Sequence, residues 1–186
     1  MQPTQLAVNL IKQMPELPTG CEITAVTMML QYAGQPVDKV TLAHEMPYDA
    51  SDWNKGFVGD PFTENGDSIY PPALVGLVTK YAGHAVDLSG KSITQLKQFL
   101  VEKQHPIVVW VGQFDGFATH ALVMTGFDDQ QVYYTDCWTG ERTFMPTEDF
   151  EQIRSKKMKL AISYWKSSQA FPERIPASRP PLKRGT

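Results

Sequence analysis

One segment of the chain, residues 19–34, constrains the fold more than any other. Its first four residues, Thr-Gly-Cys-Glu, match a helix capping box with Thr19 as the N-cap, and Gly34 stands where a glycine commonly follows a helix. After this first turn, Thr24, Thr27 and Gln31 are the only clearly polar residues before the glycine. A helix that is apolar on nearly every side must be buried. We therefore expect this helix at the centre of the molecule.

The rest of the sequence indicates an α+β fold. Further helices are predicted at residues 38–45, 72–81 and 93–103, the last opened by a second capping box from Ser92 to Gln95. After residue 105 the apolar pattern changes to that of strands, at residues 107–111, 120–125, 132–136, 142–144 and 158–164, with a short helix near 147–153. Helices followed by antiparallel strands are typical of the α+β class.

The length of 186 residues suits one globular domain, which we place at residues 1–165. Residues 166–186 hold four prolines and five basic residues against one acidic residue, a composition that predicts a flexible basic tail. Within the domain, residues 46–71 show no regular period but many Gly, Pro, Asp and aromatic residues. A stretch of that length inside a domain is typically a functional loop.

Charge and cysteine content exclude several classes of protein. The 17 Lys and Arg residues are balanced by 20 Asp and Glu residues, which argues against a nucleic-acid partner. With only Cys21 and Cys137, the chain can form neither a disulfide framework nor a four-thiolate zinc site. No apolar run approaches 18 residues, so no membrane span is expected. We expect a cytoplasmic protein if Met1 is the natural start, and an exported one if a signal peptide has been removed.

Cys21 is the first candidate for chemistry. With Thr19 as the N-cap, it would occupy the second helical position, where unpaired backbone N–H groups and the helix dipole stabilise a thiolate. The alternative is a small buried apolar residue, which is the commoner role of a free cysteine. We interpret Glu22 as the capping-box partner of Thr19 rather than as a catalytic acid.

His120 and Asp136 could complete a nucleophilic site, because a thiolate needs a base and a group that orients the base. They lie on consecutive strands of a predicted hairpin. If opposite residues have numbers that add to 256, the two face each other directly, and a sum of 258 makes them diagonal neighbours within reach. Any odd sum would place them on opposite faces of the sheet. A structural histidine, hydrogen bonded within a strand, is the alternative interpretation.

Three motifs in this order resemble those of cysteine peptidases. They are Leu17-Pro-Thr-Gly-Cys-Glu-Ile-Thr24, Thr119-His-Ala-Leu-Val-Met-Thr-Gly-Phe-Asp128, and Asp136 after the next strand. Over about residues 9–165 the chain resembles the bacterial peptidases that trim double-glycine leaders from bacteriocins and, more closely, the stand-alone peptidase C39-like family. The resemblance implies a papain-like α+β fold in which a buried N-terminal catalytic helix packs on an antiparallel sheet. It also implies Cys21 as nucleophile, His120 as general base and acid, and Asp136 as the group that fixes the imidazole tautomer.

The same family places a glutamine ahead of the cysteine to help form the oxyanion hole. The resemblance makes Gln13 the candidate, although its spacing from Cys21 is longer than in the leader-trimming enzymes, and Gln5 is the fallback. This chain also has Cys137 where the family has a proline after the aspartate. On a strand, Cys137 would point away from the face that carries Asp136, so we interpret it as a packing residue that forms no disulfide with Cys21.

Three functions remain open. The one we favour is a cysteine peptidase, a thiol hydrolase that cleaves a peptide or related amide through a thioester and needs no metal or organic cofactor. An acyl transferase would use the same thioester but pass the acyl group to an amine. A catalytically silent peptide-binding module would keep the fold without turnover.

Overall fold

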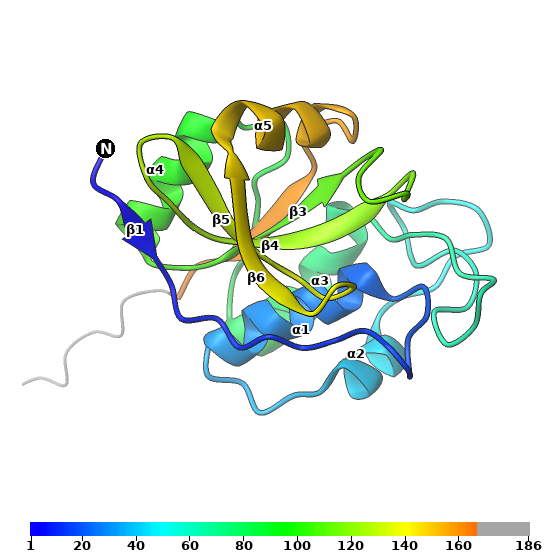
Figure 1. The fold of residues 1–186 in the computed structure, drawn as a ribbon. Helices are drawn as coiled ribbons and strands as arrows, with labels where there is room; N and C mark the ends of the chain where they lie inside the picture. Colours follow the sequence, from blue (N-terminus) through cyan, green and yellow to red (C-terminus); the bar gives the residue numbers. More distant parts are fainter. Residues whose placement is uncertain (167–186) are drawn as a thin grey trace, which may run out of the picture.

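A seven-stranded antiparallel sheet forms the centre of the computed structural model, which describes residues 1–166 (Figure 1). The predicted tail, apart from Lys166, lies outside the described residues. The sheet order is β2-β7-β3-β4-β5-β6, and β1 pairs with the end of β4. The strands are β1 (Thr4–Gln5), β2 (Ala85–Asp87), β3 (Ile107–Val111), β4 (His120–Phe127), β5 (Gln131–Asp136), β6 (Glu141–Pro146) and β7 (Ala161–Tyr164).

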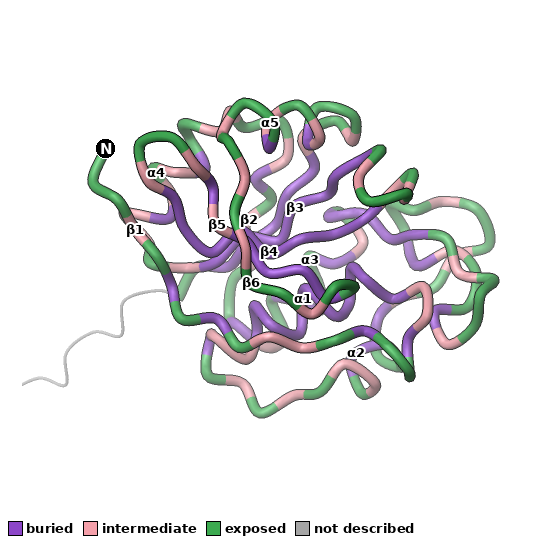
Figure 2. Tube along the Cα trace, viewed as in Figure 1, coloured by how far each residue is buried: buried purple, intermediate pink, exposed green. Residues whose placement is uncertain are grey.

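Helices cover both faces of this sheet (Figure 1). They are α1 (Cys21–Tyr32), α2 (Lys39–Glu45), α3 (Pro71–Ala82), α4 (Ile93–Lys103) and α5 (Thr147–Ser155). The first three lie below the sheet in the view of Figure 1, and α4 and α5 lie above it. Because both faces are covered, every residue of β3 and β4 is buried (Figure 2). The order of elements confirms the predicted α+β class.

Helix α1 is the buried central helix that its apolar sequence predicts. All of its residues from Cys21 to Leu30 are buried, and it packs on β4 and β3 (Figure 2). The helix ends as expected, because Gly34 adopts a left-handed conformation with a φ of 87°. The capping box predicted between Ser92 and Gln95 is present at the start of α4.

The predicted capping box at the start of α1 is wrong. Gly20 is the N-cap and contributes no side chain, so Cys21 is the first helical residue rather than the second. The hydroxyl of Thr19 instead donates to the Thr63 carbonyl oxygen at 2.9 Å. The physical reason is that the 46–70 loop, which joins α2 to α3, packs against this end of α1 and holds the Thr19 side chain through its Thr63 carbonyl oxygen.

The hairpin of β4 and β5 has the second of the two registers that bring His120 and Asp136 together. Leu122 lies opposite Asp136, which makes His120 a diagonal neighbour of Asp136. A bulge at Thr125 then shifts the pairing by one residue toward the turn. The bulged Thr125 carbonyl accepts a hydrogen bond from the Leu6 N–H at 2.8 Å, which connects the N-terminal segment to this edge of β4.

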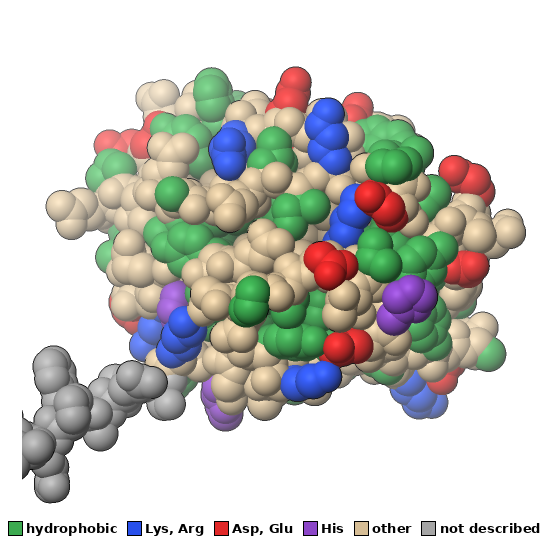
Figure 3. Space-filling model, turned by 90° about the horizontal axis from the view of Figure 1, so that it is seen from below, with side chains coloured by type: hydrophobic (Ala, Val, Ile, Leu, Met, Phe, Trp, Pro, Cys, Tyr) green, Lys and Arg blue, Asp and Glu red, His purple; other side chains and the backbone are tan. Residues whose placement is uncertain are grey.

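Other strand predictions need smaller corrections. The last strand begins at Ala161 rather than at residue 158, because Met158 and Lys159 adopt positive φ values in a turn. The two short strands β1 and β2 were not predicted, since two or three residues carry no readable alternation. Seen from below, acidic and basic side chains are interspersed with apolar ones over the surface (Figure 3). Among the described residues, no helix has both the length and the apolar character needed to cross a bilayer.

Candidate active site

The structure brings His120 and Asp136 into direct contact inside the protein. The Nε2 atom of His120 lies 2.8 Å from Oδ1 of Asp136, and the two residues are only 1% and 2% exposed. The backbone N–H of Trp138 donates to the same carboxylate oxygen at 2.8 Å. When Nε2 carries the proton that Asp136 accepts, Nδ1 of a neutral imidazole is left with a free lone pair.

The environment of Asp136 favours its charged form. Burial acts to raise the pKa of Asp136, but the hydrogen bond and charge of His120, together with backbone N–H groups of Trp138 and Thr139, outweigh it and bring the pKa below the ordinary value. Asp136 is therefore ionised at neutral pH. It can stabilise an imidazolium on His120 without taking its proton.

Cys21 stands at the first residue of α1, close to the residue that follows His120. Its side chain is buried, and the backbone of Ala121 is near enough to its sulfur to favour the charged form of the thiol. Burial raises the pKa of the Cys21 thiol well above its ordinary value, and the neighbouring Glu22 carboxylate raises it further, while the Ala121 contact acts in the opposite direction. The resting site therefore holds a neutral thiol.

Glu22 has a role that the capping-box prediction missed. The side chain is fully buried, and among the described residues no side-chain hydrogen bond caps the start of α1. Its Oε2 accepts a hydrogen bond from the Cys21 thiol at 3.2 Å, and its Oε1 accepts one from the Ser68 hydroxyl at 2.5 Å. Burial raises the pKa of Glu22 above its ordinary value, although these two hydrogen bonds and the charge of His120 oppose the rise. In the sequence, a Glu beside a candidate nucleophile is the only signal for this arrangement.

Gln13 lies in the same part of the protein, but its amide is engaged. Its Nε2 donates to the carbonyl oxygens of Pro18 at 2.9 Å and Leu17 at 3.3 Å, which uses both amide hydrogens. Its Oε1 accepts a hydrogen bond from the Cys137 thiol at 3.3 Å. An oxyanion could receive a hydrogen bond from Gln13 only if one of these carbonyl contacts, the longer one to Leu17, were given up.

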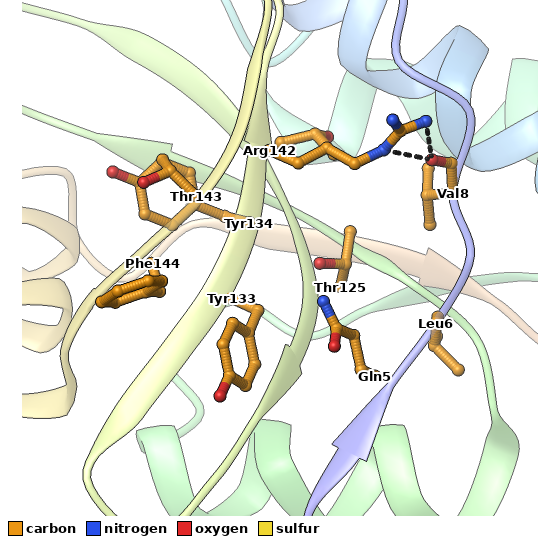
Figure 4. A pocket seen from close by; sticks show the side chains of 10 residues that line it. Gln5, Leu6, Val8, Thr125, Tyr133, Tyr134, Arg142, Thr143 and Phe144 are labelled. Carbon is orange, nitrogen blue, oxygen red and sulfur yellow. Dashed lines mark hydrogen bonds between the residues drawn. The ribbon is translucent and has the colours of Figure 1, made fainter.

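The fallback candidate, Gln5, is wrong. It pairs with Gly126, so it lies about 20 Å along β4 from His120 at roughly 3.3 Å per residue. Its side chain instead lines a pocket of about 150 Å³ between β1, β5 and β6, together with Tyr133 and Phe144 (Figure 4). Across this pocket, the Arg142 guanidinium donates to the Val8 carbonyl oxygen.

The prediction that Cys137 points away from Asp136 is also wrong. Strand β5 ends at Asp136 and the chain turns there, so the alternation of a strand no longer applies to the next residue. The Cys137 sulfur lies 3.7 Å from the Cys21 carbonyl oxygen. Both cysteines are free, as expected, and Cys137 is buried within the core.

One group among residues 1–166 has three potential metal ligands close together. These are His120, Asp136 and Cys137, whose ligand atoms lie within 4.8 Å of one another. The His120 imidazole and the Asp136 carboxylate are already hydrogen bonded to each other, and the Cys137 thiol donates a hydrogen bond to Gln13. A metal ion would therefore have to replace the contact that orients His120.

Aromatic side chains cover the imidazole from the loop between β3 and β4. The Phe117 ring stacks on His120 with centroids 5.0 Å apart and packs edge-on against Trp138 at 5.1 Å. Phe114 lies parallel to the same imidazole at 6.3 Å. Phe114 and Phe117 closely precede His120 in the chain, and that position is the sequence signal for this cover.

Comparison with known proteins gives this arrangement a context. The model of the peptidase C39 like family matches residues 5–164. The uncharacterized protein YvpB of Bacillus subtilis is 36% identical over 160 residues, which cover 70% of this chain and 64% of the relative. The chain thus spans slightly under two thirds of the length of this curated relative.

Solved structures show the same likeness. A candidate C39-like peptidase from Bacillus anthracis shares 33% identity with a TM-score of 0.82, covering 91% of this chain and all of the other. The peptidase domain of Streptococcus ComA, a bifunctional ABC transporter in a quorum-sensing pathway, has 16% identity and a TM-score of 0.60, covering 86% of this chain and 99% of that domain.

A double-glycine motif protease of an AMS/PCAT transporter, solved with its leader peptide, has 17% identity and a TM-score of 0.55. That match covers 88% of this chain and 97% of the protease. These two distant matches show the papain-like fold. Together with the family match over most of the chain, the fold shows that this protein belongs to the peptidase C39-like family.

Proposed function

We propose that this protein is a cysteine peptidase that hydrolyses a peptide or related amide bond, with Cys21 as nucleophile, His120 as general base and acid, and Asp136 as the residue that orients the imidazole. The observation that supports it most is the buried hydrogen bond from His120 to Asp136, next to the N-terminus of α1. This contact leaves one ring nitrogen free on a histidine whose chain neighbour, Ala121, contacts the Cys21 sulfur. These contacts support a site built from the base, the orienting carboxylate and the thiol.

The reaction follows from these positions. Nδ1 of His120 takes the proton of Cys21, and the sulfur attacks the substrate carbonyl carbon to give an oxyanion, stabilised by the free Cys21 N–H at the start of α1. His120 passes its proton to the leaving amine as the C–N bond breaks, which leaves a thioester. It then deprotonates the water that attacks the thioester carbonyl. The C–S bond breaks, the carboxylic acid product leaves, and His120 returns the proton to the Cys21 sulfur. Gln13 would be a second donor to the oxyanion once it releases Leu17.

A peptide-binding module without turnover is the second candidate. The specific observation in its favour is that the thiol is buried, that burial raises its pKa, and that both amide hydrogens of Gln13 are already engaged. The two candidates differ in whether His120 changes the reactivity of Cys21.

The test is alkylation of the native protein by iodoacetamide between about pH 4 and 9, with mass spectrometry of Cys21 and Cys137 separately. Because both thiols are buried, Cys137 reports any unfolding. The peptidase proposal expects Cys21 to react faster than Cys137 below the ordinary thiol pKa of about 8.5, and His120→Ala to abolish that advantage. Equal, slow labelling of both thiols that His120→Ala leaves unchanged supports the binding module instead.

Product analysis then separates hydrolysis from transfer. A peptide pool is incubated with the wild type and with Cys21→Ala, and new amino termini are compared with amide products formed on an added amine. The hydrolase expects free amino termini that depend on Cys21. Products that appear only with the added amine identify an acyl transferase.

A further inference from the structure

Glu22 is a buried carboxyl group that the proposed reaction does not use. Burying a charge is costly unless it is paired, and among residues 1–166 no Lys or Arg forms an ion pair with Glu22. It is held instead by two neutral donors, the Cys21 thiol and the Ser68 hydroxyl. A side chain kept in this position at such cost calls for an explanation in terms of the thiol it contacts.

The direction of the thiol hydrogen bond supplies that explanation. In the resting structure the Cys21 S–H donates to Glu22 Oε2 at 3.2 Å, so its proton is directed toward a carboxylate. A negative charge at this distance opposes formation of a second negative charge on the sulfur. Glu22 and the imidazole of His120 therefore act in opposite directions on the same proton.

We propose that Glu22, held by Ser68, is a positioning residue that keeps the Cys21 thiol protonated in the resting enzyme. This inference rests on the proposed function, because it assigns a brake to the same nucleophile. Ser68 belongs to the 46–70 loop, which also holds Thr19 at the entry to α1. The position of that loop therefore sets how firmly the carboxylate is held beside the thiol.

Several other ionisable groups lie around Cys21 and Glu22. His120 of β4 is near enough to Glu22 to favour the charged form of its carboxyl group. Cys137, after β5, disfavours a charge on Cys21, and Asp136, at the end of β5, disfavours one on Cys137. Burial, the charge of Asp67 and the charge of Glu22 all raise the pKa of Tyr70, which precedes α3. Among the described residues, the side chains that donate a hydrogen bond to the Glu22 carboxylate are those of Cys21 and Ser68.

The experiment measures the pH profile of Cys21 alkylation in the full chain carrying Glu22→Gln, Ser68→Ala or Glu22→Asp. Glu22→Gln removes the charge and keeps the shape, so its profile is expected to move down by about one pH unit, which is about a tenfold faster reaction below the midpoint. Ser68→Ala is expected to move it the same way by less, because a carboxylate without this donor is more easily protonated. Glu22→Asp keeps the charge and should stay near the wild type.

Glu64→Gln is the matched control, since it makes the same chemical change on an exposed side chain of the same loop, and its profile should coincide with the wild type. A Glu22→Gln profile that coincides with the wild type, or moves to higher pH, overturns the proposal. Cys137 labelling identifies a variant that has unfolded, and in that case Ser68→Ala decides. If instead His120→Ala leaves the Cys21 profile unchanged, the proposed function fails while the effect of Glu22 is still measured.

Discussion

The two sides of the candidate site each bury one carboxyl group, and the two groups are held in opposite ways. On the β4–β5 hairpin, Asp136 accepts hydrogen bonds from an imidazole and from backbone N–H groups, and its pKa is lowered despite burial. At the start of α1, Glu22 accepts from a thiol and a hydroxyl, and burial raises its pKa. The two carboxyl groups show that burial alone does not set the charge of a group, because the strength and charge of its hydrogen-bond donors also determine its pKa.

The largest expected effect is on activity, on the hairpin side. His120→Ala removes the proposed general acid and base, so kcat/KM for peptide hydrolysis should fall by about 10²- to 10⁴-fold, measured as release of new amino termini. His84→Ala is the control, because His84 is exposed and lies between α3 and β2. Equal activity in the two variants would contradict the role given to the hairpin.

The next effect is on stability at the same side. Because the folded pKa of Asp136 is lowered, its contribution to stability is present above the unfolded pKa of about 3.9 and is lost as pH falls through the folded pKa. Asp136→Asn should therefore lower the free energy of unfolding by about 1–3 kcal/mol at pH 7. In urea unfolding from pH 7 down to pH 3, the difference in the free energy of unfolding between the wild type and the variant should become smaller. A difference that stays constant would count against an ionised Asp136.

Glu22→Gln should show the opposite pH trend. A raised folded pKa gives a contribution that is complete below the unfolded pKa of about 4.3 and is lost as pH rises through the folded pKa. The wild type is thus penalised at pH 7, and the variant should be more stable there by about 1 kcal/mol, since a buried charge is replaced by a neutral group. The same urea series should show the two proteins converging near pH 4. A variant less stable than the wild type at pH 7 would remove the contrast with Asp136.

The smallest effect concerns the aromatic cover on the hairpin side. Phe117→Leu removes the ring that stacks on His120 and packs against Trp138, and it should lower the free energy of unfolding by about 0.5–1.5 kcal/mol. It should also speed alkylation of Cys21. Phe144→Leu breaks a comparable contact with Tyr133 on β6, outside the site, so its alkylation rate should match the wild type. Identical rates in both variants would show that Phe117 does not shield the thiol.

Strong local patterns were enough to predict the elements that carry the site. The apolar run of α1 and the short apolar runs of β4 and β5 predicted a central helix and an antiparallel hairpin, and an even register was sufficient to bring His120 to Asp136. The bulge at Thr125 was not predicted from the sequence. Next to the turn Gly126 pairs with Tyr133, which is an odd register, and the bulge shifts the pairing by one residue to the even register of Leu122 and Asp136. The same bulge provides the carbonyl group that anchors the N-terminal segment.

The sequence by itself determined the class of the fold, because helix and strand periodicity acts between neighbouring residues. Its motifs, through their resemblance to cysteine peptidases, were also enough to nominate Cys21, His120 and Asp136 for the proposed site. Only the tertiary structure decided the surroundings of the thiol. Glu22 accepts a hydrogen bond from Ser68, 46 positions away in the chain, instead of taking its expected capping role. Cys137 lies against Cys21 because the strand before it has ended. Contacts between such distant residues depend on how a loop packs over the end of a helix, and no local pattern encodes that packing.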